Sequence, residues 1–294
     1  MGDVVKQNSF RAWILAVRPK TLSGACVPVV VASSLAYADY VFLWQPALLC
    51  LMFAILMQIA ANFVNDYYDF LRGTDRTDRL GPERACSMGW ISPSAMKKAA
   101  VIVMIVACGL GLALLQWGQW WFVAVGIACV LFAWLYTVVL SYWGWGDVLV
   151  LVFFGVVPVC CTYFAQAGHI TINSLFCGLA SGWVIDLLLI VNNYRDRDTD
   201  KISGKYTLIV RMGERFGRFQ YLWTGVLAWA CCLPLGINGH VWVVVLTSAF
   251  LPFHFIVWRK MVTIRQGKSL NSVLGKTSAG MLLLGALLSI GLLL

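Results

Sequence analysis

The feature that most constrains this chain is a series of apolar stretches, each long enough to cross a lipid bilayer. Hydrophobic residues make up 61% of its 294 residues and charged residues only 12%, about half the charged share of an average soluble domain. Nine stretches carry few or no charges and have the length of about 17 to 25 residues that a membrane helix requires. They are 21–38, 46–70, 94–116, 120–137, 147–165, 172–194, 218–237, 240–258 and 277–294. The polar and apolar alternation of outer-membrane barrels is missing, so the sequence predicts an all-α integral membrane protein with one domain over residues 1–294.

The basic residues predict the orientation of these helices. A cytoplasmic N-terminus and nine crossings would place residues 1–20, 71–93, 138–146, 195–217 and 259–276 on the inner side. All 22 Lys and Arg residues lie in or beside these segments, as the positive-inside rule requires. We therefore expect a protein of the plasma (inner) membrane with a cytoplasmic N-terminus and an outside C-terminus. This topology and anionic lipid headgroups account for the net charge of +9, so nucleic acid is not an expected partner.

Residues 1–20 are expected to lie at the membrane surface. Phe10, Trp13, Ile14 and Val17 share one face of a helix that ends at Pro19, which is the pattern of an amphipathic interfacial helix. The ten cysteines lie mostly in apolar runs without metal-ligand spacing, and the three histidines have no Glu or Cys one helical turn away. Neither a zinc site nor a nucleotide-binding loop is predicted.

Acidic residues gather in two short stretches, which hold eight of the 13 Asp and Glu residues. The first runs from Asn62 to Glu83 at the end of the second apolar run. The second runs from Asn192 to Asp200 at the end of the sixth. Residues three or four positions apart share a helix face, so each stretch presents a stripe of Asn and Asp side chains at its helix end. The stripes contain Asn62, Asn65, Asp66 and Asp69 in the first stretch and Asn192, Asp196 and Asp200 in the second, while Asp198 points elsewhere.

Two such stripes facing each other across a cytoplasmic cavity would bring four or more carboxylates together. Crowded like charges are costly unless cations join them. Carboxylates suit Mg²⁺, which is usually held by one or two of them together with substrate phosphates. One acidic helix end is commonly just a solvated end, but the repetition, with Asn leading each time, favours a magnesium-bridged phosphate or diphosphate site. Nearby cations able to contact phosphate are Arg72, Arg84, Lys201, Lys205 and Arg211.

At these motifs the chain resembles the UbiA superfamily of intramembrane aromatic prenyltransferases, whose pattern is NDxxD after the second helix and DxxxD after the sixth. Asn65-Asp66-x-x-Asp69 and Asp196-x-x-x-Asp200 match this pattern. Further stretches are similar to the branch of 1,4-dihydroxy-2-naphthoate polyprenyltransferases of menaquinone synthesis. They are Arg18-Pro-Lys-Thr-Leu, Gly73-Thr-Asp75, Arg84 with Gly89-Trp-Ile-Ser-Pro, and Gly204-Lys-Tyr-Thr-Leu-Ile-Val-Arg-Met-Gly213. The chain departs from that branch at Tyr136-Thr137-Val138-Val139, where a Gly-Gly-Pro turn is usual.

The resemblance implies a nine-helix UbiA-type bundle with a cytoplasm-facing active-site cavity, Mg²⁺ as cofactor and active-site loops at 71–93 and 195–217. It implies transfer of a polyprenyl group from its diphosphate to 1,4-dihydroxy-2-naphthoate, with loss of CO₂ and diphosphate, to give demethylmenaquinol. The implied catalytic residues and metal ligands are Asp66, Asp69, Asp196 and Asp200, with Asp75 as a further ligand. The implied diphosphate contacts are Asn65, Arg72, Asn192, Lys201, Lys205 and Arg211. The implied acceptor contacts are Lys20, Asn62, Arg84, Tyr136 and Asp147.

Two other functions remain open at this point. 4-Hydroxybenzoate and other aromatic polyprenyltransferases of the superfamily share the diphosphate site, and only the branch-specific stretches separate them. A cation transporter would need acids near the bilayer midplane and broken helices at matching positions, whereas most acids here lie at helix ends. Asp186 is an exception, inside the sixth apolar run. Such a residue is either functional or a protonated group bonded to a neighbouring helix.

Overall fold

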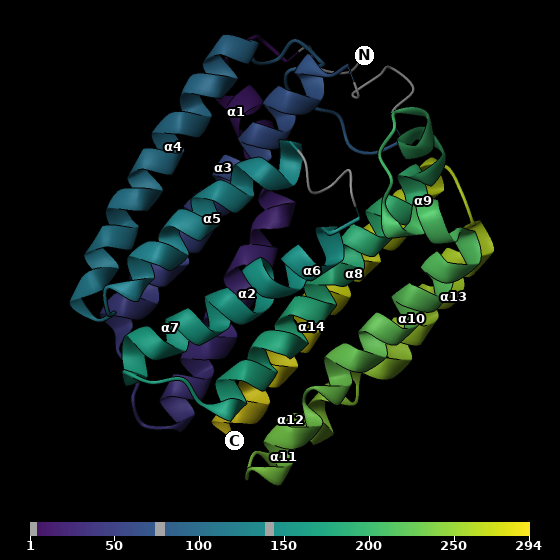
Figure 1. Cartoon of the computed structure of the whole chain (residues 1–294). Coiled ribbons are helices and arrows are strands. Elements are labelled where there is room, and N and C mark those ends of the chain that lie inside the picture. The colour runs from purple at the N-terminus through teal and green to yellow at the C-terminus, as the bar shows by residue number, and fades with distance from the viewer. Residues whose placement is uncertain (1–4, 74–79, 139–143) are drawn as a thin grey trace.

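The computed structural model describes residues 5–73, 80–138 and 144–294, with the side chains of residues 136–138 left out. Helices make up most of this part of the chain, and it contains no strand (Figure 1), as predicted. The longer helices are α1 (Phe10–Val17), α2 (Pro19–Ala38), α3 (Trp44–Leu71), α4 (Pro93–Ala113), α5 (Trp121–Val138), α7 (Val157–Ala167), α8 (Ile172–Ile202), α10 (Glu214–Ala230), α12 (Val241–Thr247), α13 (Phe250–Ile264) and α14 (Asn271–Leu293). Short helices are η1 (Leu114–Gln116), α6 (Gly146–Val150), η3 (Leu151–Val156), α9 (Leu208–Met212), α11 (Leu233–Ile237) and η4 (Lys268–Leu270).

Eight helical segments of the described chain are long and apolar enough to cross a membrane. They are Pro19–Ala38, Trp44–Leu71, Pro93–Gln116, Gly146–Ala167, Ile172–Ile202, Glu214–Ile237, Val241–Ile264 and Lys268–Leu293. A ninth apolar helix, Trp121–Leu135, is shorter than these and corresponds to the predicted run 120–137. The apolar segments therefore match the predicted runs, while nine crossings stay a prediction.

Both acidic stretches lie at one end of the bundle, called here the motif end. It is formed by the C-terminal ends of α3 and α8 and the N-terminal ends of α4, α10 and α14. The chain runs up and down between this end and the opposite one, where the C-terminus lies (Figure 1). The two stretches are thus brought to the same side of the molecule, as predicted.

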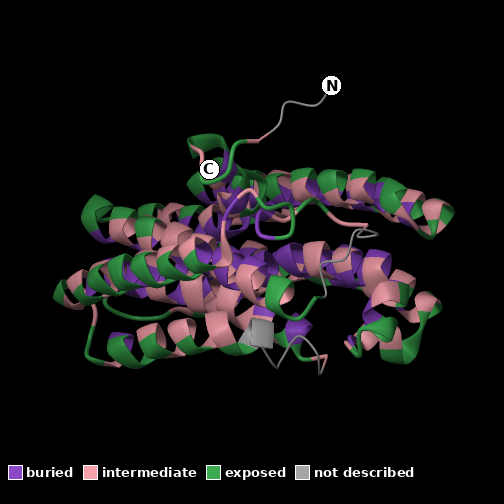
Figure 2. Cartoon of the chain, turned by 90° about the horizontal axis from the view of Figure 1, so that it is seen from above, coloured by how far each residue is buried: buried purple, intermediate pink, exposed green. Residues whose placement is uncertain are grey.

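The centre of the bundle is built around α8. Buried apolar side chains of α8 pack against α10, α13 and α14 in one cluster and against α2 and α7 in another, and exposed residues cover the outward surfaces of the outer helices (Figure 2). Glycines let α8 approach the π-helix η3 closely, since a Cβ on Gly155 would lie 2.5 Å from the carbonyl oxygen of Gly178. Small residues at such contacts are typical of membrane helix packing. The sequence patterns did not predict the π-helix.

The apolar run 172–194 is part of a longer helix, because α8 continues to Ile202. The second acidic stretch therefore lies on the last turns of α8, as its helical spacing predicted, and the helix extends into the segment 195–217 that was expected to be a loop. The N-terminal lead-in helix is present, but its buried face is Ala12 and Ala16, while Phe10 is 81% exposed. Phe10, Ile14 and Leu15 therefore face away from the bundle, where an interfacial helix would contact lipid, whereas Trp13 packs against Phe63 of α3.

Candidate active site

The first acidic stretch begins with a buried carboxylate that binds a loop. Asp66, on the last turns of α3, is 1% exposed. Its two oxygens accept backbone hydrogen bonds from the N–H groups of Ala85 and Cys86, each at 3.0 Å. Arg18, at the joint between α1 and α2, lies 3.7 Å from the same carboxylate. Asp66 therefore fixes the segment that follows Arg84 against the end of α3.

Because Asp66 holds this segment, Arg84 lies beside Asp69, the next carboxylate of the stripe. Arg84 Nη2 lies 3.0 Å from Asp69 Oδ2, and both side chains are mostly buried. Asn62, one turn before Asp66, is buried as well. Its amide donates to the carbonyl of Val17 at 2.9 Å and to the hydroxyl of Thr21 at 3.0 Å. The side chain of Asn62 thus holds the α1–α2 joint beside the motif.

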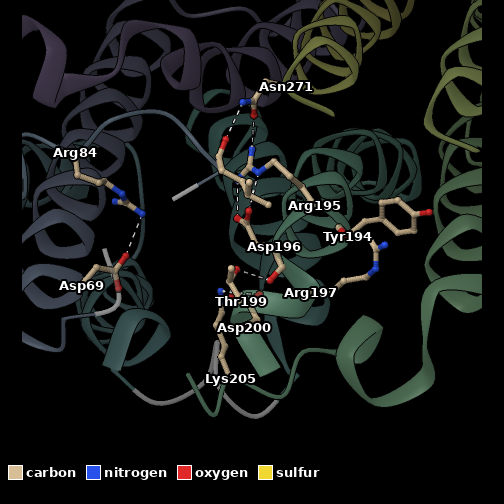
Figure 3. A network of polar contacts seen from close by, with 11 residues as sticks. Asp69, Arg84, Tyr194, Arg195, Asp196, Arg197, Thr199, Asp200, Lys205 and Asn271 are labelled. Carbon is tan, nitrogen blue, oxygen red and sulfur yellow. Dashed lines mark hydrogen bonds and ion pairs between the residues drawn. The ribbon is translucent and has the colours of Figure 1, made fainter. Parts of the chain in front are cut away.

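The second acidic stretch carries a pair of neighbours joined side chain to side chain. Arg195 is 3% exposed, and its Nε and Nη2 donate to the two oxygens of Asp196 at 2.7 and 2.6 Å. Its Nη1 donates to Asn271 Oδ1 at 2.8 Å (Figure 3). Asp196 keeps a quarter of its side chain exposed, so it remains accessible while Arg195 is bonded to it.

Asp200, one turn further along α8, has a free acceptor. Its Oδ2 is buried and accepts no hydrogen bond within the described structure, and Lys205 Nζ lies 3.7 Å from it as an ion pair. Asp198 is exposed, as predicted for the side chain off the stripe. The carboxylates of the second stripe thus present oxygen atoms with unused lone pairs beside cations.

Each of the four stripe carboxylates is paired with its own cation. Figure 3 shows Asp69 with Arg84 apart from the group that contains Asp196 and Asp200. Among the described residues, no three His, Cys, Asp or Glu side chains are close enough together to hold one metal ion. This arrangement suits Mg²⁺, which takes one or two carboxylates and completes its shell with water and substrate phosphates. The buried, unbonded Asp200 Oδ2 also fits an incoming cation.

An apolar cavity of about 290 Å³ begins beside the first stripe. Its lining includes Asn65, adjacent to Asp66, and runs along α3 to Cys50, a distance of about 22 Å at the rise of an α-helix. Gln58, Asn65 and Thr162 are the polar side chains among its described lining residues, and the rest are apolar, Gly or Cys. The cavity can therefore hold a hydrocarbon chain whose polar head is at the motif end.

Comparison with known proteins places this geometry in a family. The model of the UbiA prenyltransferase family matches residues 25–290. The chain belongs to the UbiA prenyltransferase family. It is 38% identical to the 1,4-dihydroxy-2-naphthoate octaprenyltransferase of Mycobacterium leprae over 74% of this chain and 76% of that one. It is 32% identical to the enzyme of the same name from Haemophilus influenzae over 97% of each chain, which confirms the resemblance seen in the sequence.

Solved structures confirm the UbiA fold. A UbiA homolog from Archaeoglobus fulgidus bound to geranyl diphosphate (GPP) and Mg²⁺ has a TM-score of 0.65 at 14% identity, covering 96% of this chain and 99% of that one. The same homolog bound to dimethylallyl diphosphate (DMAPP) and Mg²⁺ has a TM-score of 0.64 at 15% identity, covering 96% and 98%. At these identities the likeness concerns the fold.

The remaining residues proposed for this UbiA-family site are spread over several positions. Lys20, Lys201 and Arg211 are exposed, and Asn192 is half-buried. Arg211 Nε donates to the carbonyl of Tyr206 at 3.1 Å. Arg72 caps the end of α3. Asp75 and the side chain of Tyr136 lie outside the described residues.

Two buried acids lie further into the UbiA-family bundle. Asp147 is 8% exposed and accepts a hydrogen bond from Gln220 at 2.5 Å, so its described partner is a neighbouring helix. Asp186 is fully buried, and neither oxygen accepts a hydrogen bond within the described part of the chain. The hydrogen bond to a neighbouring helix considered for Asp186 is therefore absent from the described structure.

Sequence analysis missed three residues that organise this site. Arg18 belongs to a stretch that resembles the family and was given no role in the site, yet it pairs with Asp66. Arg195 and Asn271 hold Asp196 from two helices. The position of Arg195 beside Asp196 was a usable signal for the first contact, but no sequence pattern indicates the contact with Asn271, 76 residues away.

Proposed function

We propose that this chain transfers a polyprenyl group from a polyprenyl diphosphate to 1,4-dihydroxy-2-naphthoate, releasing diphosphate and CO₂ and giving demethylmenaquinol. The observation that carries the proposal is the position of two carboxylate motifs, each already paired with cations, at the end of the bundle where a long apolar cavity begins beside Asn65. The acceptor comes from the names of relatives that are 32–38% identical. Related structures with prenyl diphosphates and Mg²⁺ support the donor and the metal.

The paired cations give the site a way to accept a negatively charged head group. Asp69 and Asp196 would hold Mg²⁺ on their accessible oxygens, with Asp66 and Asp200 beside them. When bound, Mg²⁺ neutralises the diphosphate and makes it a better leaving group. Arg84 and Lys205 are close to these carboxylates and would turn from them to the phosphate oxygens. Arg195 would stay on Asp196, because all three of its guanidinium nitrogens donate within the protein.

The cavity supplies the site for the hydrocarbon part of the donor. Its apolar walls exclude water from the first isoprene unit, where the allylic cation forms as the C–O bond to diphosphate breaks. The aromatic side chains of Phe53, Phe132, Phe153 and Phe154 line it and offer π faces to a cation. A polyprenyl tail would follow α3 from Asn65 toward Cys50.

The acceptor would be attacked at its carboxyl-bearing ring carbon. A new C–C bond forms there from the aromatic π electrons, and the C–CO₂ bond then breaks to restore aromaticity, so CO₂ leaves and no oxidant is needed. Lys20, an exposed cation on the first turn of α2, would contact the acceptor carboxylate. The alternative acceptor within the family is 4-hydroxybenzoate, which would be prenylated at another ring carbon and would keep its carboxyl group.

We further propose that the motif end faces the cytoplasm and that the protein resides in the inner membrane. The basic residues of the sequence support this orientation through the positive-inside rule, and the eight apolar helices support an integral membrane protein. The N-terminus would then be cytoplasmic and the C-terminus outside.

The test is incubation of the purified protein with Mg²⁺, a polyprenyl diphosphate and a panel of aromatic acids, with product masses recorded. A product from dihydroxynaphthoate lighter by CO₂ than simple prenylation is expected. A product only from 4-hydroxybenzoate would move the chain to the alternative acceptor. No prenylated product from any acceptor would contradict the proposed activity.

A further inference from the structure

The amide of Asn271 joins the two acidic motifs. Asn271 is the first residue of α14. Its Oδ1 accepts from Arg195 Nη1 at 2.8 Å, and its Nδ2 donates to the carbonyl of Leu80 at 2.9 Å. Arg195 lies on α8 and Leu80 lies in the connection between α3 and α4, 191 residues before Asn271. One side chain therefore contacts segments from both halves of the chain (Figure 3).

Each contact of Asn271 leads toward a motif carboxylate. On one side, Arg195 holds both oxygens of Asp196 through its remaining nitrogens. On the other side, the main chain runs from Leu80, whose carbonyl accepts from Asn271, to Arg84, which pairs with Asp69. The Asp69 and Asp196 carboxylates are thus connected through Asn271 by polar contacts between 2.6 and 3.0 Å and the short main-chain segment 80–84.

The chemistry of the bridge requires an amide. A carbonyl oxygen must face the guanidinium and an N–H must face the Leu80 carbonyl, and Asn supplies both on one short side chain. Aspartate would lose the donor to Leu80 and would compete with Asp196 for Arg195. Alanine would lose both contacts.

We propose that Asn271 is a positioning residue for the transfer reaction, which sets the spacing of the two motifs for a magnesium-bridged diphosphate. This inference rests on the proposed function. Asn271 acts through Arg195 and through the Leu80 segment, and touches neither donor nor acceptor. A site whose carboxylates are held in place before the ions arrive binds them at lower concentration, because less ordering remains to be done.

The experiment compares N271A and N271D with wild type in full-length protein, measuring transfer against Mg²⁺ concentration. Loss of a hydrogen bond to a charged group is expected to raise the half-saturating Mg²⁺ concentration about tenfold in N271A. N271D, which loses the Leu80 contact, is expected to raise it as well. N238A is the matched control, since Asn238 also bridges to another segment, with Nδ2 2.6 Å from Asn173 Oδ1, but at the opposite end of the bundle.

A purely structural role would lower thermal stability and leave the Mg²⁺ dependence unchanged. Half-saturation equal to wild type in both N271A and N271D, with Mg²⁺-dependent transfer in the wild type, would overturn this inference alone. If N271A does not fold, N271D decides the question. Absence of transfer in the wild type would instead overturn the proposed function, and the positioning role with it.

Discussion

Asp69 and Arg84 are joined by an ion pair in which Oδ2 and Nη2 lie 3.0 Å apart across 15 residues of chain. Asp66 supports this contact, because it accepts hydrogen bonds from the backbone N–H groups of Ala85 and Cys86, the two residues after Arg84. A cation thus occupies the carboxylate that we assign to Mg²⁺. When the diphosphate binds, it would replace Asp69 as the partner of Arg84, and Mg²⁺ would replace Arg84 as the partner of Asp69. Neither side chain would then be left with an unpaired charge.

Replacing the motif carboxylates tests this assignment. We expect Asp69→Asn and Asp196→Asn each to lower transfer about 100-fold or more, because a neutral amide is a poor magnesium ligand. Asp198→Asn is the matched control, since Asp198 lies on the same turn of α8 but is exposed. The measurement is the initial rate of prenyl transfer by each variant at saturating Mg²⁺. Wild-type rates in either motif variant would remove that motif from the metal site.

Filling the cavity is expected to separate long donors from short ones. Gly126 lines the cavity, and a Cβ there would meet no atom within 4 Å, so the side chain of Gly126→Phe has room to start toward the cavity. We expect turnover of a long polyprenyl diphosphate to fall while that of a short diphosphate such as GPP is largely kept. Gly109→Phe is the control, because Gly109 is equally open but is absent from the cavity lining. Equal losses with both donors would place the tail elsewhere.

Asn62 is expected to contribute to stability. Its buried amide makes hydrogen bonds to Val17, Thr21 and Gln58, so Asn62→Ala should lower the free energy of unfolding by about 2 kcal/mol. Thermal unfolding in detergent and the KM for the acceptor are measured on the same preparation. An unchanged melting temperature with a raised acceptor KM would show that Asn62 binds the acceptor after all.

Accessible cysteines test the orientation. In a variant without native cysteines, Ser203→Cys should react with an impermeant thiol reagent only from the cytoplasmic side, and His169→Cys only from the other. Both positions are exposed, and Ser203 follows the end of α8 whereas His169 follows the end of α7. Labelling of the two positions from the same side would contradict the proposed topology.

The sequence predicted the elements of this fold better than their contacts. Hydropathy located the apolar helices, because a membrane helix must be long and apolar whatever it packs against. Hydropathy alone ends the sixth run at 194, where the charged residues begin, whereas the helical spacing of Asn192, Asp196 and Asp200 indicated the continuation of α8 to Ile202. The π-helix at Leu151–Val156 contains Gly155, which lies close to Gly178 of α8. This tertiary contact cannot be predicted from the local sequence.

The spacing of the acidic residues predicted that the carboxylates gather at one end of the bundle, but it did not predict their partners. Spacing alone shows that Asp66 and Asp69 share a face of α3. It does not show that Asp66 binds the backbone at Ala85 and Cys86, or that Arg84 pairs with Asp69. These contacts join residues that only the folded chain brings together, as does the bridge through Asn271.

Release of a carboxyl label is the most direct measurement of the central claim. With carbon-14 in the carboxyl group of 1,4-dihydroxy-2-naphthoate, labelled CO₂ should appear in proportion to prenylated product, and only when Mg²⁺ and the polyprenyl diphosphate are both present. The C–CO₂ bond breaks only after the C–C bond forms, so the radioactivity released as CO₂ reports on both steps. A prenylated product that retains the label would contradict the assigned reaction.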